Sequence, residues 1–453
     1  MGWSMIGAQI GRATAFCVAL LAAPLAADDG FARLEGHGGP IKGVAVSPDG
    51  SQALTASFDY SIGLWDVETG TRQAWLEGHR AAVNAVAFTG DGKVLSAGDD
   101  FELILWDLST GTPVRRFEGH KGKILDIDLS PDGRWAATAG WDGWIGLWDL
   151  EGTLPVRWLK GHKSNVNDTV FSADGARLYS ASYDGTIRVW DVAEGTSRPL
   201  VSHGFGVNHV VLNRSLGWLA YGALDGAIRV LDLDTETEIA DLTADRRPVL
   251  SLALNPDGTR LAVGDGEGYV MIIDAVTWTI ERDFHAATRG PIWALAWTAD
   301  GARVLSGGID DAAALWPVAA SDEAVAEILA TGERSFLRDP AEMTNGERQF
   351  ARKCSICHTL TPDGARRAGP SLYGIFGRRA GTYAGYRYSP ALAQSDIVWD
   401  AETIDRLFEE GPDHYTPGSK MPMQVIAGVA DRADLIAFLA QNTGPRGGPQ
   451  QGE

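Results

Sequence analysis

Two cysteines and a histidine near the C-terminal end of the chain have the spacing of a covalent cofactor site. The pentapeptide Cys354-Ser355-Ile356-Cys357-His358 places an imidazole directly after a Cys-x-x-Cys pair. In c-type haem attachment, two such thiols add to the vinyl groups of the macrocycle and the adjacent imidazole reaches the iron. A bare Cys-x-x-Cys pair also occurs in redox disulfides and in zinc sites. Neither the βαβ context of the first nor the further ligands of the second are visible nearby, so the motif predicts one covalently bound haem c.

The residues on either side of this motif predict a helical framework for it. Gly346 and Phe350 are four residues apart, so on a helix they share one face and permit a close crossing with an aromatic contact. Residues 431–439, which include Phe438, can form the crossing helix. We therefore expect the two ends of a unit spanning residues 341–443 to pack against each other.

Further motifs in this unit resemble those of class I cytochromes c of the mitochondrial type. They are Gly369-Pro370-Ser371-Leu372-Tyr373-Gly374-Ile375-Phe376-Gly377-Arg378-Arg379-Ala380-Gly381, Gly385-Tyr386-Arg387-Tyr388, Trp399 and Pro417-Gly418-Ser419-Lys420-Met421. The resemblance implies a small all-α fold in which the Met421 sulfur completes the iron coordination begun by His358. It also implies that the Pro370 carbonyl faces the imidazole and fixes its orientation, as outer groups generally do for metal-bound histidines.

The same resemblance implies which polar side chains surround the haem propionates. They are Tyr388, Trp399 and an arginine, either Arg378 or its neighbour Arg379. One position departs from the family, because an apolar residue such as Leu407 stands where the family often has a tyrosine near the methionine sulfur.

Met423 and His414 are the alternatives to Met421 as an axial ligand. The family register favours Met421, and His414 lies in a loop between Pro412 and Pro417 that we expect to be exposed. Ligation by histidine and methionine raises the haem potential relative to two histidines and leaves the iron without an open position. The metal ligands are therefore predicted to be His358 and Met421, with no catalytic residue.

A second region, residues 31–316, consists of seven repeats, the last three of them degraded. Each clear repeat has a Gly-His pair, an apolar stretch, a Gly-containing turn and a closing Trp-Asp pair. These marks recur every 41 or 42 residues, at His37, His79, His120 and His162 and at Trp65, Trp106, Trp148 and Trp190. Short β-rich runs separated by Gly, Asp and Ser turns predict strands. The pattern resembles the WD-repeat family and so implies a seven-bladed β-propeller of four-stranded blades.

Six residues before most closing positions stands an aspartate, which the resemblance assigns to a structural His, Ser/Thr, Asp and Trp hydrogen-bond network. These residues are Asp59, Asp100, Asp142, Asp184, Asp225 and Asp310, with Glu267 breaking the pattern in repeat six. Outside the repeat positions, His209 and His285 are the remaining candidates for acid–base chemistry, and we interpret both as unpaired rim residues. Residues 31–35 match the outer strands of later repeats and should close the ring by pairing with the blade that ends at Trp316.

The first 27 residues have the pattern of a secretory signal peptide. Arg12 precedes a short apolar run that Pro24 interrupts, and small residues lead to Ala27. The run is shorter than the roughly 20 residues needed to span a bilayer. We expect cleavage near Ala27, no membrane span in the mature chain, and a periplasmic location.

The charge of the chain is concentrated in the repeats. The net charge is −20, while residues 341–443 carry 11 Lys and Arg against 12 Asp and Glu. An acidic surface disfavours nucleic acid, whose phosphates attract Lys and Arg, and permits docking to a basic partner. Cys17 lies in the signal segment, so no structural disulfide framework remains.

Together these observations predict a multidomain protein, with an all-β seven-bladed propeller at 28–316 followed by a small all-α cytochrome c domain at 341–443. Residues 317–340 form a linker with a short helix at 321–329, and 444–453 form a flexible tail. The expected function is single-electron transfer, with the propeller docking redox protein partners. The alternatives are a haem-containing oxidoreductase whose propeller binds a substrate, and a redox-responsive scaffold.

Overall fold

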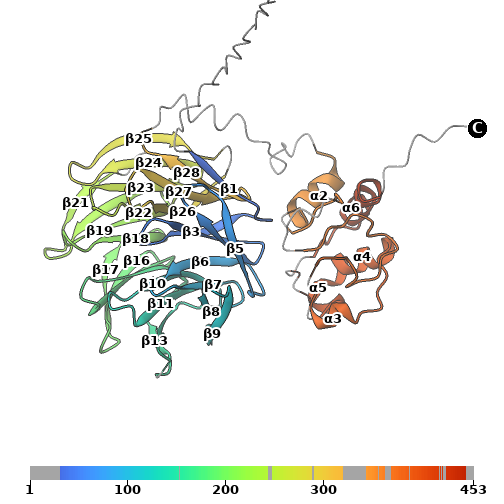
Figure 1. Ribbon diagram of the computed structural model, residues 1–453, viewed down its shortest axis with the longest axis horizontal. Coiled ribbons are helices and arrows are strands. Elements are labelled where there is room, and N and C mark those ends of the chain that lie inside the picture. Colours follow the sequence, from blue (N-terminus) through green and yellow to red (C-terminus); the bar gives the residue numbers. More distant parts are fainter. Residues whose placement is uncertain are drawn as a thin grey trace, which may run out of the picture.

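The computed structural model describes two folded units, one of strands and one of helices (Figure 1). The described residues are 31–152, 154–242, 247–287, 290–319, 343–355, 357–362, 369–386, 388–417, 419, 421 and 425–444. The expected signal peptide, the linker helix at 321–329 and almost all of the C-terminal tail lie outside these residues. Among the described residues, no helix is both long enough and apolar enough to cross a bilayer.

Seven antiparallel sheets of four strands form the first unit, as the repeat pattern predicts. Blade one holds β2 (Ile41–Val46), β3 (Gln52–Ser57), β4 (Ser61–Asp66) and β5 (Arg72–Glu77), and blade two β6 (Val83–Phe88), β7 (Lys93–Gly98), β8 (Glu102–Asp107) and β9 (Thr112–Glu118). Blade three holds β10 (Ile124–Leu129), β11 (Trp135–Gly140), β12 (Trp144–Asp149) and β13 (Arg157–Lys160), and blade four β14 (Val166–Phe171), β15 (Arg177–Ser182), β16 (Thr186–Asp191) and β17 (Ser197–Ser202). Blade five holds β18 (Val207–Asn213), β19 (Trp218–Ala223), β20 (Ile228–Asp232) and β21 (Glu238–Asp241), and blade six β22 (Val249–Leu254), β23 (Arg260–Asp265), β24 (Tyr269–Asp274) and β25 (Thr279–His285).

Blade seven closes the ring with strands from both ends of the repeat region. It consists of β26 (Ile292–Trp297), β27 (Arg303–Gly308), β28 (Ala312–Pro317) and β1 (Ala32–Glu35). The antiparallel β1–β28 pairing sets Ala32 opposite Leu315 and Leu34 opposite Ala313. The predicted closure by the N-terminal strand is confirmed, and the closed ring leaves only the short outer edges of the individual blades.

Apolar side chains between neighbouring sheets make up the core of the propeller. Leu54 and Ile62 of blade one, for example, pack with Val83, Val94 and Ile104 of blade two, and all five are fully buried. Each sheet buries both of its faces against neighbouring sheets. Apolar residues therefore occupy successive positions along its strands as well as alternate ones. The same arrangement repeats around the ring.

In each of blades one to four, buried polar side chains form a chain of hydrogen bonds. In blade one, His37 donates from Nδ1 to Asp59 (3.0 Å), Thr55 donates to His37 Nε2 (2.7 Å), and Trp65 donates to the Thr55 hydroxyl (2.7 Å). Equivalent bonds hold His79, His120 and His162. Both ring nitrogens are satisfied, so these histidines are structural.

Blades five and six depart from this network. In blade five His203 is turned over, so that Nε2 meets Asp225 and the Tyr221 hydroxyl reaches Nδ1 (3.2 Å). In blade six Asp265, rather than Glu267, accepts the backbone N–H groups of the turn. Repeat six has Glu267 where the other repeats have the turn aspartate, and Asp265, two residues earlier, takes over its hydrogen bonds.

The inner strands of neighbouring blades are joined by side chains that bond the next strand's backbone. Asp168 of β14 accepts from the Val210 N–H of β18 (2.6 Å), and Asp128 of β10 accepts from Phe171 of β14 (2.6 Å). His209 lies 2.9 Å from Asp168 and faces the central channel. His209 was interpreted as an unpaired rim residue. The ring brings β18 beside β14, so His209 Nδ1 contacts the Asp168 carboxylate, but it makes no hydrogen bond among the described residues. His285 is hydrogen-bonded through Nε2 to the Glu267 carbonyl (3.1 Å), which corrects its assignment as unpaired.

The described residues of the helical unit form five helices. They are α2 (Asn345–Lys353), α3 (Pro390–Ala393), α4 (Ala401–Glu410), α5 (Pro412–Tyr415) and α6 (Val429–Asn442). The α2 and α6 helices cross where Gly346 stands, because a Cβ there would collide with the Asp434 carbonyl oxygen. Phe350 and Phe438 meet beside this crossing, with ring centroids 5.6 Å apart. The crossing expected from Gly346 and Phe350 is therefore present.

Candidate functional site

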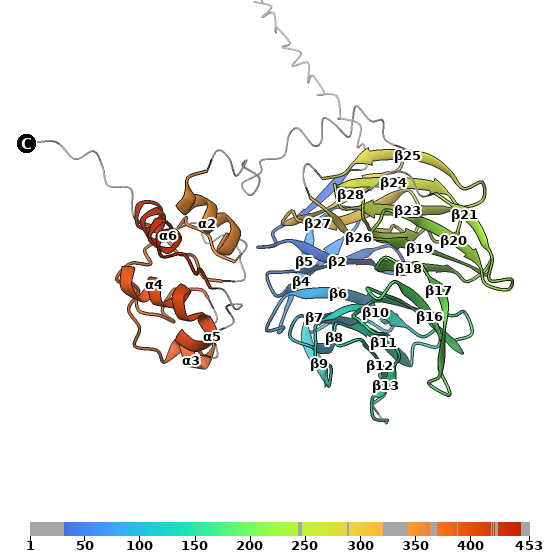
Figure 2. The ribbon, with the colours of Figure 1, turned by 180° about the vertical axis from the view of Figure 1, so that it is seen from behind.

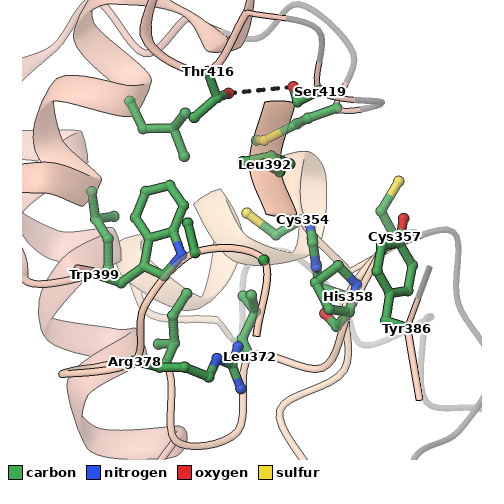
Figure 3. Close-up of a pocket in the computed structure, with 18 of the residues that line it drawn as sticks. Cys354, Cys357, His358, Leu372, Arg378, Tyr386, Leu392, Trp399, Thr416 and Ser419 are labelled. Carbon is green, nitrogen blue, oxygen red and sulfur yellow. Dashed lines mark hydrogen bonds between the residues drawn. The ribbon is translucent and has the colours of Figure 1, made fainter. Parts of the chain in front are cut away.

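One apolar cavity in the helical unit gathers the predicted site residues (Figure 3). Its lining includes Cys354, Cys357, His358, Pro370, Arg378, Tyr388, Trp399 and Met421. These residues come from the end of α2, from the loops on either side of α3, and from the loop between α5 and α6. The cavity, together with its mouth and the solvent-filled space there, contains about 1070 Å³ that no protein atom fills. The arrangement therefore has room for a large planar group.

The end of α2 presents the two thiols and the imidazole. Cys354 caps the helix by donating its backbone N–H to the Phe350 carbonyl (2.8 Å), and the His358 N–H returns to the Cys354 carbonyl (2.8 Å). This turn directs all three side chains of the motif toward one cavity. Cys354 is buried, Cys357 is half-buried, and neither is part of a disulfide. Burial raises the pKa of Cys354 to about 12, so the thiol is protonated at neutral pH.

His358 has its ring fixed by a single backbone acceptor. Nδ1 donates to the Pro370 carbonyl (2.7 Å), as the family resemblance implies. A Cβ at Gly369 would collide with the ring, so glycine is required for this close approach. Burial lowers the pKa of His358 and favours the neutral imidazole. No hydrogen bond to Nε2 occurs among the described residues, which leaves that nitrogen available as a ligand.

Met421 lines the same cavity from the loop between α5 and α6, and it packs beside the apolar core of the unit. In that loop Thr416 hydrogen-bonds to Ser419 (3.3 Å, Figure 3). His414 is exposed and lies outside the cavity lining, as expected. Met423 and Lys420 lie outside the described residues, so the choice between the two methionines rests on family register.

The walls of the cavity are apolar and mostly buried. They include Leu372, Ile375, Ala380, Leu392, Ile404, Leu407, Phe408 and Leu439. Leu407, noted in the sequence as a departure from the family, is one of these wall residues. Two thiols, a thioether and an imidazole nitrogen that no described residue hydrogen-bonds are set in such walls and form the donor set of a covalently held haem. The residues present therefore fit this group.

The zinc alternative for the Cys-x-x-Cys pair would require further ligands. Among the described residues, no cluster of three or more His, Cys, Asp and Glu side chains is present. The donor set at Cys354 and Cys357 is instead completed by His358 and a methionine, which suits iron in a macrocycle.

The two neighbouring arginines have different positions. Arg378 donates to the Tyr373 and Ser371 carbonyls (2.9 and 2.8 Å), which holds its half-buried guanidinium at the cavity edge. Arg379 pairs on the surface with Asp396 (2.9 Å) and bonds the Ser395 carbonyl. Burial lowers the pKa of Arg378. Both arginines considered for the propionates line the cavity, and Arg378 is the more buried of the two.

Sequence reasoning missed two tyrosines that line the cavity, Tyr386 and Tyr60. Tyr386 lies within a motif that was recognised, and burial raises its pKa to about 12. Tyr60 belongs to the propeller, where it precedes β4 in blade one. No local pattern could have predicted its place in the cavity, because that depends on how the two units meet.

Comparison with known proteins supports both units. The family model "WD domain, G-beta repeat" matches residues 31–66, 70–107, 111–149, 153–191, 236–274 and 278–317, and the model "Cytochrome c" matches residues 343–443. The cytochrome c of Gossypium barbadense is 41% identical over 105 residues, which cover 23% of this chain and 93% of that protein. Those of Gibberella zeae (39% over 104 residues; 22% and 95%) and Chlamydomonas reinhardtii (38% over 110 residues; 24% and 97%) are similar. The chain thus belongs to the WD-repeat family and carries, after its seven-bladed propeller, a cytochrome c domain, which implies a covalently bound haem c.

Proposed function

We propose that this protein is a periplasmic electron-transfer cytochrome in which Cys354 and Cys357 hold the haem and His358 and Met421 ligate its iron. The observation that carries the proposal is the cavity itself, where a thioether and an imidazole nitrogen to which no described residue bonds share apolar walls. When bound, the haem supplies reversible one-electron exchange. Cytochrome c domains transfer electrons in this way, and WD-repeat propellers bind proteins.

The chain's own residues suit a closed electron relay. Pro370 orients His358 and fixes the proton on Nδ1, so that Nε2 is the ligand atom. With Met421 as the second ligand, no position would remain for a substrate. The apolar walls exclude water, which favours the less charged state of the iron and so raises its potential.

The propeller is proposed as the docking module for a redox protein with a basic face. The support is its acidity, because the excess of Asp and Glu lies outside residues 341–443. Acidic surfaces steer basic partners and speed association at low ionic strength. Its buried histidines are engaged at both ring nitrogens, so they do not favour the oxidoreductase alternative.

Export is a further part of the proposal and rests on residues 1–27. A separate experiment tests it: fractionation of cells of the source organism, followed by N-terminal sequencing of the purified protein. We expect the protein in the periplasmic fraction with a new N-terminus near Asp28. A cytoplasmic protein that retains Met1 would refute this part without affecting the haem assignment.

The ligand assignment is tested by the absorption spectrum of the purified holoprotein. We expect low-spin iron with a weak thioether-to-iron charge-transfer band, which Met421→Ala abolishes and the matched Met423→Ala retains. Loss of the band only in Met423→Ala would show that Met423, and not Met421, ligates the iron. A high-spin, peroxide-reactive iron in the unmodified protein would contradict the electron-carrier function.

A further inference from the structure

At one turn position, two blades of the propeller have residues whose side chains are strained by the backbone conformation there. The residue that follows the turn acid and precedes the third strand of each blade is glycine with positive φ in blades three to six: Gly143, Gly185, Gly226 and Gly268, with φ of 78°, 81°, 87° and 96°. Blades one and two have Tyr60 and Phe101 instead, with φ of 71° and 67°. Side chains are strained in this left-handed region, and glycine is not. Folding of the turn therefore does not explain an aromatic residue here.

Tyr60 contributes to the cavity of the other unit. It lines the haem cavity together with Cys357 and Tyr386, which lie 297 and 326 residues further along the chain. Burial raises the pKa of Tyr60, and the nearby Cys357 and Tyr386 raise it further. Both views show the helical unit on the side of the propeller where β5 of blade one is labelled (Figures 1 and 2). The strained residue thus projects from the propeller to the corner of the cavity at Cys357.

We propose that Tyr60 is a positioning residue that docks the propeller on the haem cavity, so that the face of blade one around it is the binding surface for this chain's own cytochrome c domain. The contact closes the cavity at Cys357 against water and leaves other edges for an external redox partner. Strain at a left-handed aromatic residue is retained when another contact offsets it. Here the contact is the burial of Tyr60 in the cavity that it lines together with Tyr386 and Cys357. The inference does not depend on which proteins donate or accept the electrons.

Phe101 provides a matched control because it shares the backbone strain but not the cavity. It is 40% exposed and does not line the cavity. Tyr60→Gly and Phe101→Gly should both relieve strain, so neither should lower the unfolding temperature of the propeller. Only Tyr60→Gly removes the contact between the units, and Tyr60→Phe should preserve most of it.

The test compares these three variants as full-length holoproteins. For Tyr60→Gly we expect faster amide exchange in residues 383–388, a larger radius of gyration by small-angle X-ray scattering and a lower haem reduction potential, because water reaches the cavity. Phe101→Gly should match the unmodified protein in all three measurements, and Tyr60→Phe should remain close to it. If Tyr60→Gly behaves like Phe101→Gly, the docking role is refuted. A propeller that unfolds at lower temperature in Tyr60→Gly would instead assign Tyr60 to blade stability and would also overturn the proposal.

Discussion

The buried histidines of the propeller and the buried histidine of the cytochrome c domain differ in what their second ring nitrogen contacts. In blades one to four, Nδ1 donates to a carboxylate and Nε2 accepts from a hydroxyl, as at His120 with Asp142 and Thr138. At His358, Nδ1 donates to a neutral carbonyl and Nε2 has no hydrogen bond among the described residues. A ring satisfied at both nitrogens stabilises the fold, and a ring oriented by one is prepared for a metal. Burial alone does not distinguish the two uses.

Replacing a buried histidine by alanine should change the haem spectrum in the cytochrome c domain and the stability in the propeller. The largest effect is expected at the haem. His358→Ala should abolish the low-spin absorption spectrum of the holoprotein, because an axial ligand is lost. The propeller should unfold as before, since His358 contributes nothing to the blades. A low-spin spectrum that survives the substitution would show that another residue ligates the iron.

The complementary change in blade three should act on stability alone. His120→Ala removes one member of a buried pair with Asp142, whose side chains are 0% and 5% exposed. We expect a loss of about 3 kcal/mol in the free energy of unfolding of the propeller, measured by urea denaturation. The haem spectrum should not change. A shifted spectrum with unaltered stability would remove the distinction between the two kinds of histidine.

The carboxylates of the propeller allow a second contrast, in their response to pH. Asp184, paired with His162, has a pKa lowered to about 2, so its contribution to stability is lost as pH falls from about 4 toward 2. Burial raises the pKa of Asp128 to about 6, so the folded state keeps a proton that the unfolded state releases near pH 4. Stability from this residue is therefore lost as pH rises from about 4 to 6.

Asp128→Asn should remove that loss and flatten the pH dependence of unfolding between pH 4 and 6. We expect a relative gain of about 2 kcal/mol at pH 7, discounted because the carboxylate is partly exposed. Urea denaturation at pH 4.5 and pH 7 measures it. An unchanged slope would mean that Asp128 titrates normally in the folded state.

Blade five offers the smallest effect. His203 is turned over, and its partner Asp225 is 30% exposed, so water competes for the pair. His203→Ala should cost about 1 kcal/mol, less than the same change at His120. Equal losses at the two positions, measured by urea denaturation, would show that ring orientation and exposure do not matter here.

Much of the architecture follows from local patterns in the chain. The repeats predicted seven blades, and the match of residues 31–35 to later outer strands predicted closure by β1. The pentapeptide at 354–358 and the family motifs predicted residues that line one cavity. In each case, a short segment carries its own structural information, because neighbouring residues form the turn, strand or helix that presents them.

What could not be predicted depends on contacts between distant segments. The contact between His209 and Asp168 was not predicted, because Asp168 lies on the preceding blade and only the ring brings the two strands together. The reversed ring of His203 follows from Tyr221, whose larger side chain replaces a Ser or Thr. Tyr60 reaches the haem cavity only through the meeting of two units. The spacing of residues along the chain does not indicate which distant residues lie close together in the folded protein.

The closure of the ring also determines how the propeller would bear mechanical load. β28 is the last strand before the chain continues toward the cytochrome c domain, and it lies between β27 and β1. A pull on the cytochrome c domain, as when a partner dissociates from it, therefore enters the propeller through a strand that is hydrogen-bonded along both edges. The blade opens only after β28 has separated from both β27 and β1. The first strand of the propeller, β1, thus holds the last strand, β28, in place.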